Sequence, residues 1–130
     1  MAIPDDLERR HTLSTATTRY DELRMRDALA AMAEDDHTQP LTREESLELL
    51  ALSEVVIRKA GYGRQAMVRS ARANGASWTQ IGAALGSSKQ AAWEAHTRWI
   101  EDQARQHERT GYTGLEPEQA DEARRLAGPY

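Results

Sequence analysis

The stretch SWTQIGAALGSSKQAAWEAHTRW, residues 77–99, decides the fold predicted for this chain. Ser77 and Gln80, three residues apart, form the capping-box pattern that opens a helix. Gly86 marks the end of that helix, because glycine readily adopts the left-handed conformation that a tight corner needs. A second helix follows, and Gly82 has no side chain that would keep this second helix away. The stretch therefore predicts two helices that cross closely around one corner.

The apolar residues of this stretch predict which sides of its helices face the core. Ile81 and Leu85 are four residues apart in the first helix, and both are expected to point inward. The second helix does not stop at Trp99, because helix-forming residues continue to about Arg109. Its predicted inner face consists of small residues, namely Ala91, Ala92 and Ala95.

The whole chain of 130 residues is predicted to be all-α, a helical bundle of about five helices. The segments between glycines and prolines are long and rich in helix-forming residues, and no alternating apolar pattern indicates a strand. We expect three regions. These are an acidic helical region that dimerises (1–60), the region of the two crossing helices (61–109), and a C-terminal tail or short helix (110–130). A helix in this last region would run from Pro117 to Leu126.

In the acidic region, one helix is expected to begin at Thr18, with Asp21 completing its cap. Residues 1–16 are expected to form a looser arm, and the helix is expected to end in the segment EDDHTQP before Pro40. Five residues at helical spacing predict a single apolar face. They are Met25, Ala28, Leu29, Met32 and Ala33.

A second helix in this region is opened by a capping box at Thr42 and Glu45, with Leu41 as a hydrophobic staple, and Gly61 is expected to end it. Its apolar residues cover several sides, which is typical of a helix that is central to its domain or meets a second subunit. A shorter helix is expected over 64–73, with Ala66, Met67 and Ala71 toward the core and its arginines outside.

Charge is distributed unevenly along the chain. The net charge is −4, yet residues 1–57 carry 6 basic and 13 acidic side chains, whereas residues 58–109 carry 9 basic and 4 acidic ones. A basic segment in an acidic chain is what an electrostatic footprint for a polyanion looks like, although solvated charges also cluster by chance.

Several function classes lack their sequence signals. There is no cysteine, so disulfides and thiolate metal sites are excluded, and the start of the chain has no apolar segment of a signal peptide. No apolar run is long enough to span a bilayer, and the four histidines have no metal-site spacing. We expect a cytoplasmic protein that is not an enzyme and has no cofactor, no metal and no membrane partner.

The segment ASWTQIGAALGSSKQAAWEAHTRW resembles the helix-turn-helix family of DNA-binding regulators, and more narrowly the motif of small actinobacterial DNA-binding proteins. The resemblance covers about residues 61–100. Two positions depart from it: Gly82 stands where the family usually has alanine, and Ser87 stands where an apolar residue usually fills the corner. The resemblance implies a double-stranded DNA partner and makes the second helix the recognition helix. Because that helix continues to about Arg109 and the helix opened at Thr42 is apolar on several sides, we also expect a homodimer, the usual architecture of such DNA-binding proteins.

The resemblance also implies candidate site residues. Base edges would be read by Ser88, Lys89, Gln90, Trp93 and Thr97. Phosphates would be bound by Ser77, Thr79, Gln80, Arg64, Arg69, Arg72 and Arg98. Alternatives stay open for two of these residues. Gln90 either reads a base or caps the second helix, and Trp93 either contacts the groove or packs within the protein.

The function expected from this resemblance is that of a sequence-specific transcriptional regulator. Two alternatives remain. One is an architectural protein that coats duplexes without reading their sequence, and the other is a protein–protein interaction module that binds a partner such as an RNA polymerase subunit. The operator, the regulated genes and any effector do not follow from the sequence.

Overall fold

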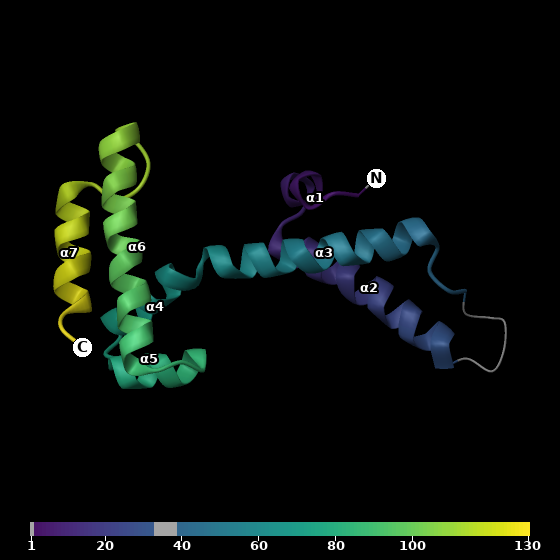
Figure 1. The fold of residues 1–130 in the computed structure, drawn as a ribbon, viewed down its shortest axis with the longest axis horizontal. Helices are drawn as coiled ribbons and strands as arrows, with labels where there is room; N and C mark the ends of the chain where they lie inside the picture. The colour runs from purple at the N-terminus through teal and green to yellow at the C-terminus, as the bar shows by residue number, and fades with distance from the viewer. Residues whose placement is uncertain (1, 33–38) are drawn as a thin grey trace. The chain divides into compact units, whose positions relative to one another are not determined.

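The fold is described from a computed structural model, which covers residues 2–32 and 39–130. Within these ranges the protein is all-α, with seven helices and no strand (Figure 1). The chain divides into two compact units. We call Met1–Gly63 the first unit and Arg64–Tyr130 the second unit. Helix α7 belongs to the second unit together with α4, α5 and α6.

The first unit consists of α1 (Pro4–Arg10), α2 (Leu13–Met32) and α3 (Arg43–Tyr62). Helices α2 and α3 form an antiparallel pair, held by ion pairs from Arg19 to Glu48 at 3.0 Å and from Arg26 to Glu45. Helix α1 packs against α3. The buried side chains of this core are Leu7, Ala16, Leu23, Ala51, Leu52 and Val55.

The start of α2 differs from the prediction, because Thr18 is not its cap and residues 1–16 are not a loose arm. Thr12 begins the helix: its hydroxyl accepts from the N–H of Thr15 at 3.2 Å, and the Thr15 hydroxyl accepts from the N–H of Thr12 at 3.0 Å. Thr18 lies in the helix and donates to the carbonyl of Ser14 at 3.0 Å. A threonine thus replaces the Glu or Gln of an ordinary capping box.

The predicted apolar face of α2 is a real stripe, but it does not face the core of the first unit. Met25 is 65 % exposed and Met32 is 78 % exposed, and Leu29 lies between them. The buried face is formed instead by Ala16 and Leu23. Ala33 and the predicted loop EDDHTQP, apart from its last two residues, lie outside the described residues.

Helix α3 begins as predicted and ends later than predicted. The Thr42–Glu45 capping box is confirmed, and Leu41 packs against the core. Gly61 does not end the helix, which continues to Tyr62. Arg58 and Tyr62, one turn apart, both bond the carboxylate of Glu8 in α1, and these contacts hold the last turn in place.

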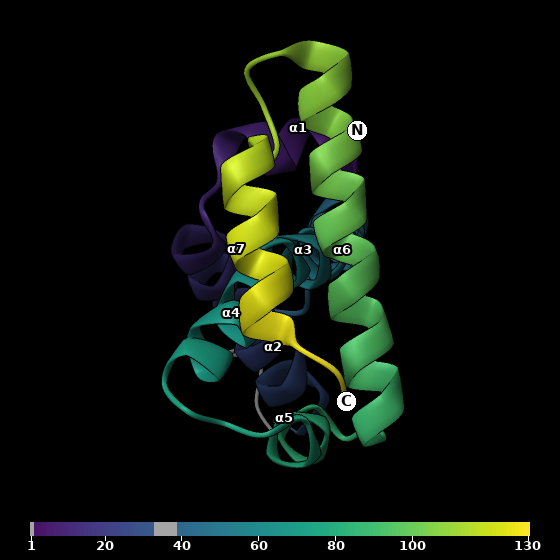
Figure 2. The same ribbon diagram turned by 90° about the vertical axis from the view of Figure 1, so that its left-hand side faces the viewer.

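The second unit consists of α4 (Arg64–Ala73), α5 (Trp78–Leu85), α6 (Lys89–Thr110) and α7 (Pro117–Ala127). Helices α6 and α7 lie side by side, and α5 crosses the N-terminal end of α6 (Figures 1 and 2). An ion pair from Arg124 to Glu101 at 2.7 Å links α7 to α6. The buried core consists of Val68, Trp78, Ile81, Ala92, Ile100, Ala123 and Ala127.

The extents of α4, α6 and α7 agree with the predicted ones to within a residue, but several inward-facing assignments are wrong. Ala66, Met67, Ala91 and Leu85 are exposed, and Val68 is the residue of α4 that is buried. The core lies between α4 and the other three helices of the unit, α5, α6 and α7, so Val68 points inward and Met67 does not. The all-α prediction is confirmed. The described residues form seven helices where about five were expected, because α1 was expected to be irregular and α7 was left open as a tail or a short helix.

Candidate nucleic-acid interface

Helix α5 is opened by the capping box predicted from the sequence. The Ser77 hydroxyl accepts from the N–H of Gln80 at 3.1 Å, and the Gln80 side-chain oxygen accepts from the N–H of Ser77 at 2.9 Å. Both side chains are exposed but already engaged with the backbone. Thr79, between them, is exposed and its hydroxyl has no hydrogen-bond partner within the described chain.

The corner between α5 and α6 is tight, and two glycines make it so. Gly86 has a φ of 70°, the left-handed conformation, and the N–H of Ser87 bonds the carbonyl of Gly82 at 2.8 Å. A Cβ on Gly82 would lie 2.9 Å from the carbonyl carbon and oxygen of Ser88 and 3.0 Å from the nitrogen of Lys89. The start of α6 therefore rests directly on the backbone of α5.

The first turn of α6 projects from this corner. Ser88 is its N-cap, and its hydroxyl accepts from the N–H of Ala91 at 3.0 Å. Lys89 and Gln90 are exposed. Gln90 does not cap the helix; its amide nitrogen donates to the carboxylate of Glu94 at 2.9 Å, one turn further along the same surface.

The C-terminal segment reaches the same turn. The indole N–H of Trp93 donates to the carbonyl of Gly128 at 2.7 Å, and the Trp93 ring packs against the Tyr130 ring with centroids 5.0 Å apart. The ammonium of Lys89 lies 5.7 Å from the centroid of the same Tyr130 ring. Trp93 is thus half-buried by the C-terminal segment, which is the packing alternative described above.

Thr97 lies one turn beyond Trp93 and is half-buried. Its hydroxyl donates to the carbonyl of Glu94 at 3.1 Å, a bond within the helix itself. Of the five residues predicted to read bases, Lys89 and Gln90 are therefore the exposed ones whose side chains do not bond the backbone.

The predicted phosphate-binding arginines fall into two groups. Arg64, Arg69 and Arg98 form no ion pair with any described residue. Arg72, predicted to stay outside, is instead part of the framework. Its guanidinium donates to the carbonyls of Leu126, at 3.1 to 3.2 Å, and Ala76, at 3.0 Å, and lies 5.1 Å from the Trp78 ring centroid.

A buried histidine lies behind the surface of α6. His96 is 1 % exposed, its ring packs against the rings of Trp78 and Trp99, and its Nδ1 is 2.9 Å from the side-chain oxygen of Gln65. Burial lowers the pKa of His96 from 6.5 to about 4, with Arg69 and Arg72 contributing in the same direction. His96 is therefore neutral at pH 7, and it belongs to the core rather than to a binding surface.

No sequence pattern indicates that the end of α7 contributes to this site. The buried indole of Trp78 donates to the carbonyl of Ala127, the last residue of α7, and the half-buried indole of Trp93 donates to the carbonyl of Gly128, which follows it. The guanidinium of Arg72 also donates to the carbonyl of Ala127. Because these acceptors are backbone atoms, no side chain of α7 indicates them. The only possible hint was that Arg72, Trp78 and Trp93 carry N–H donors for which the sequence predicts no acceptor.

The fold defines the class of protein as all-α and defines no more than that. Comparison with family models, curated proteins and solved structures finds no match for this chain. The described residues include no cluster of three or more His, Asp or Glu side chains placed to hold a metal. None of the described helices is long and apolar enough to cross a membrane.

Proposed function

We propose that the protein is a cytoplasmic, homodimeric DNA-binding regulator, in which α5 and α6 act as a helix-turn-helix and the first turn of α6 reads the major groove. The observation that carries the proposal is the close contact at Gly82. It fixes the start of α6 against α5 and leaves Lys89 and Gln90 exposed at the tip. A recognition helix needs such a rigid support, because base readout depends on placing donors within a few tenths of an ångström.

Three arginines of the second unit support the same proposal. Arg64, Arg69 and Arg98 have no carboxylate partner among the described residues, so their guanidinium groups are available to phosphates. Lysine donates to guanine O6 and N7, and glutamine pairs with adenine N6 and N7. To reach a base, Gln90 would have to release Glu94. Ser88, Ser77 and Gln80 are engaged in caps, so in this proposal they position the helices, and Trp93 braces α6 against the C-terminal segment.

The test uses the two lysines of the chain as a matched pair. Duplexes are first selected from a random pool with the full protein, and affinities are then measured by fluorescence anisotropy between 50 and 200 mM salt. We expect Lys89→Ala to lower affinity for the selected duplex by roughly 5- to 150-fold, the equivalent of ~1–3 kcal/mol, and to relax preference at one base pair. Lys59→Ala, in the first unit, is expected to leave both unchanged.

Each other outcome has a definite meaning. Equal losses for Lys89→Ala and Lys59→Ala would contradict base reading by α6. Equal affinity for selected and random duplexes would instead indicate an architectural DNA-binding protein. No binding to any duplex at 50 mM salt would remove DNA as the partner.

A second candidate function, binding of a protein partner, is favoured by one specific observation. A groove of about 260 Å³ runs between α4 and α5, and its lining is mostly apolar, with Met67 61 % exposed and Leu85 38 % exposed. An amphipathic helix is the kind of partner that such a groove accepts. Met67→Gln is expected to leave DNA affinity within about twofold if DNA is the partner, and to weaken only a protein complex.

A further inference from the structure

The α2–α3 pair is covered on one face and open on the other. Arg58 and Tyr62 of α3 contact α1, and they lie on the face that follows Ala51 and Val55 at helical spacing. A separate face of α3, about a third of a turn away, presents Leu50 and Ile57, which are 66 % and 68 % exposed. No described element of the first unit packs on this face.

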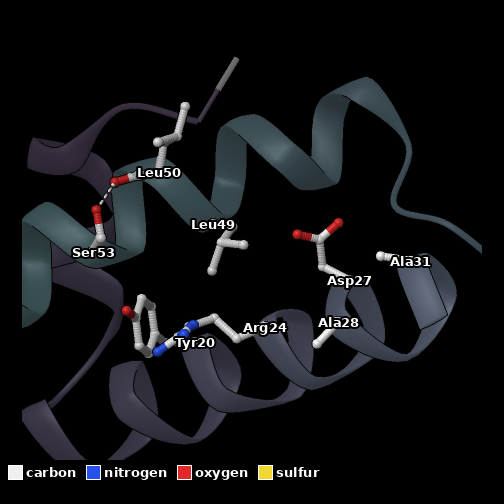
Figure 3. A pocket seen from close by; sticks show the side chains of 8 residues that line it. All are labelled: Tyr20, Arg24, Asp27, Ala28, Ala31, Leu49, Leu50 and Ser53. Atoms are coloured by element: carbon white, nitrogen blue, oxygen red, sulfur yellow. Dashed lines mark hydrogen bonds between the residues drawn. The ribbon is translucent and has the colours of Figure 1, made fainter.

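The open face contains a groove, which Figure 3 shows from close by. Tyr20, Arg24, Asp27, Ala28 and Ala31 of α2 line it together with residues 49, 50 and 53 of α3, and its volume is about 330 Å³. Leu49 points into the groove from α3, whereas α2 contributes small side chains at Ala28 and Ala31 (Figure 3). A helix surface of small residues allows another helix to approach closely.

The first unit exposes more large apolar side chains than it buries. Its core holds six buried side chains, two of them alanines. By contrast Met25, Leu29, Met32, Leu50 and Ile57 are all more than half exposed in this unit of the described chain. Exposed apolar surface on this scale indicates an interface rather than a free surface. Leu50 of this set lines the groove, whereas Met25, Leu29 and Met32 lie on another side of α2 from Arg24 and Asp27.

The groove residues on α2 are complementary to themselves under a two-fold rotation. Arg24 lies over the Tyr20 ring at 5.6 Å, and neither Arg24 nor Asp27 forms an ion pair with a described residue. If two α2 helices pack antiparallel about a point midway between residues 25 and 26, Arg24 of each chain meets Asp27 of the other. The same point brings the large Tyr20 against the small Ala31.

We propose that this face is the interface with a second copy of the chain, with α2 packed antiparallel to the partner's α2 and two Arg24–Asp27 ion pairs across the two-fold axis. In a two-fold interface, a contact from one residue to a second residue of the partner is repeated in the opposite direction. The Arg24–Asp27 and Tyr20–Ala31 pairs both satisfy this requirement. This interface specifies which surface forms the homodimer of the proposed function. It rests on the proposed homodimer and does not depend on DNA binding.

The size of the face fits a stable dimer. A helix of 20 residues is about 30 Å long and about 10 Å wide, so the open face of two such helices covers about 600 Å². Accessible area exceeds this projected area because side chains protrude. Standard interfaces bury about 800 Å² per partner, and this face therefore provides nearly the whole of one.

The test is a charge-reversal cycle read by sedimentation velocity without DNA. Arg24→Asp places two like-charged pairs at the interface, and so does Asp27→Arg. Each single variant is expected to raise the dimer dissociation constant about 30-fold, because two symmetry-related attractions become repulsions. An equimolar mixture of the two variants restores both ion pairs, and we expect a heterodimer within about threefold of the natural affinity.

A matched control tests whether a charge reversal away from the interface also affects dimerisation, through folding or through net charge. Arg9→Asp makes the same reversal on α1, where the Arg9 side chain is 72 % exposed and, among the described residues, pairs with Asp6 alone. This variant should leave the dimer intact. Far-UV circular dichroism checks that each variant remains helical. The proposal is overturned if the natural protein is a monomer at about 100 µM, a concentration that corresponds to a dissociation free energy of about 5.5 kcal/mol. It is also overturned if the single variants dimerise normally, or if the mixture dimerises no better than they do.

The outcome is distinguishable from failure of the proposed DNA binding. A dimer that follows the charge cycle but binds no duplex would refute DNA binding and leave the interface in place. A monomer that binds a selected duplex in a Lys89-dependent way would refute the interface and leave base reading in place.

Discussion

The contact at Gly82 predicts a measurable cost for a single methyl group. In Gly82→Ala, the new Cβ would lie 2.9 to 3.0 Å from three backbone atoms of Ser88 and Lys89, closer than real Cβ contacts. Backbone cannot swing aside as a side chain does, so α6 must move away from α5. Such overpacking typically costs ~1–3 kcal/mol, and the higher helix propensity of alanine returns up to ~1 kcal/mol. We expect a net loss of about 1 kcal/mol.

Tryptophan fluorescence is the suitable assay, because Trp78, Trp93 and Trp99 all lie in the second unit and report its unfolding alone. Urea titration of the natural protein and of Gly82→Ala gives the two free energies of unfolding. Our reasoning would be refuted if alanine at this position raised the free energy of unfolding, because the close contact would then not exist.

Gly61→Ala is the matched control. Gly61 lies inside α3, and no atom lies within 4 Å of its added Cβ. The same substitution should therefore stabilise the first unit by roughly 0.5–1 kcal/mol, through helix propensity alone. This gain is read by far-UV circular dichroism, and the tryptophan transition should not move.

Two further predictions concern the core of the second unit. Because burial lowers the pKa of His96 to about 4, the unfolded chain binds a proton below pH 6.5 that the folded unit resists. The free energy of unfolding should therefore fall by about 2–3 kcal/mol between pH 6.5 and 4.5 relative to a His96→Leu variant, in urea titrations followed by tryptophan fluorescence; parallel profiles for the two proteins would contradict this. Arg72→Ala removes the donor to the last carbonyls of α7 and should cost about 2–3 kcal/mol, whereas Arg98→Ala should stay within about 0.5 kcal/mol. Equal effects of the two substitutions would show that Arg72 is not structural.

The features that were predictable from the sequence are those determined within four residues of chain. The capping boxes at Ser77–Gln80 and Thr42–Glu45 and the left-handed Gly86 are local, because each depends on a donor, an acceptor or a φ angle nearby. The Thr12–Thr15 cap is equally local, but threonine in the place of glutamate or glutamine gives no recognisable pattern.

Which apolar and charged side chains are buried was not predictable in the same way, because burial depends on which distant helix arrives. Leu85 and Met67 have the right spacing and remain exposed, since α7 packs elsewhere and selects Val68. Arg72 looks like a surface cation in sequence, but it is a half-buried donor because the carbonyls of α7 and of Ala76 accept from its guanidinium. At the candidate site, the exposure of Lys89 was predictable, whereas its position over Tyr130 was not.

The acceptors at the end of α7 also determine what mutagenesis is able to detect. The carbonyls of residues 126–128 receive Arg72 and the indoles of Trp78 and Trp93, and every residue type carries such a carbonyl. An alanine scan across these positions would leave all of these acceptors in place and would report the segment as unimportant for hydrogen bonding. Only changes that redirect the chain, such as a proline or a shortened C-terminus, would reveal how much of the second unit depends on it.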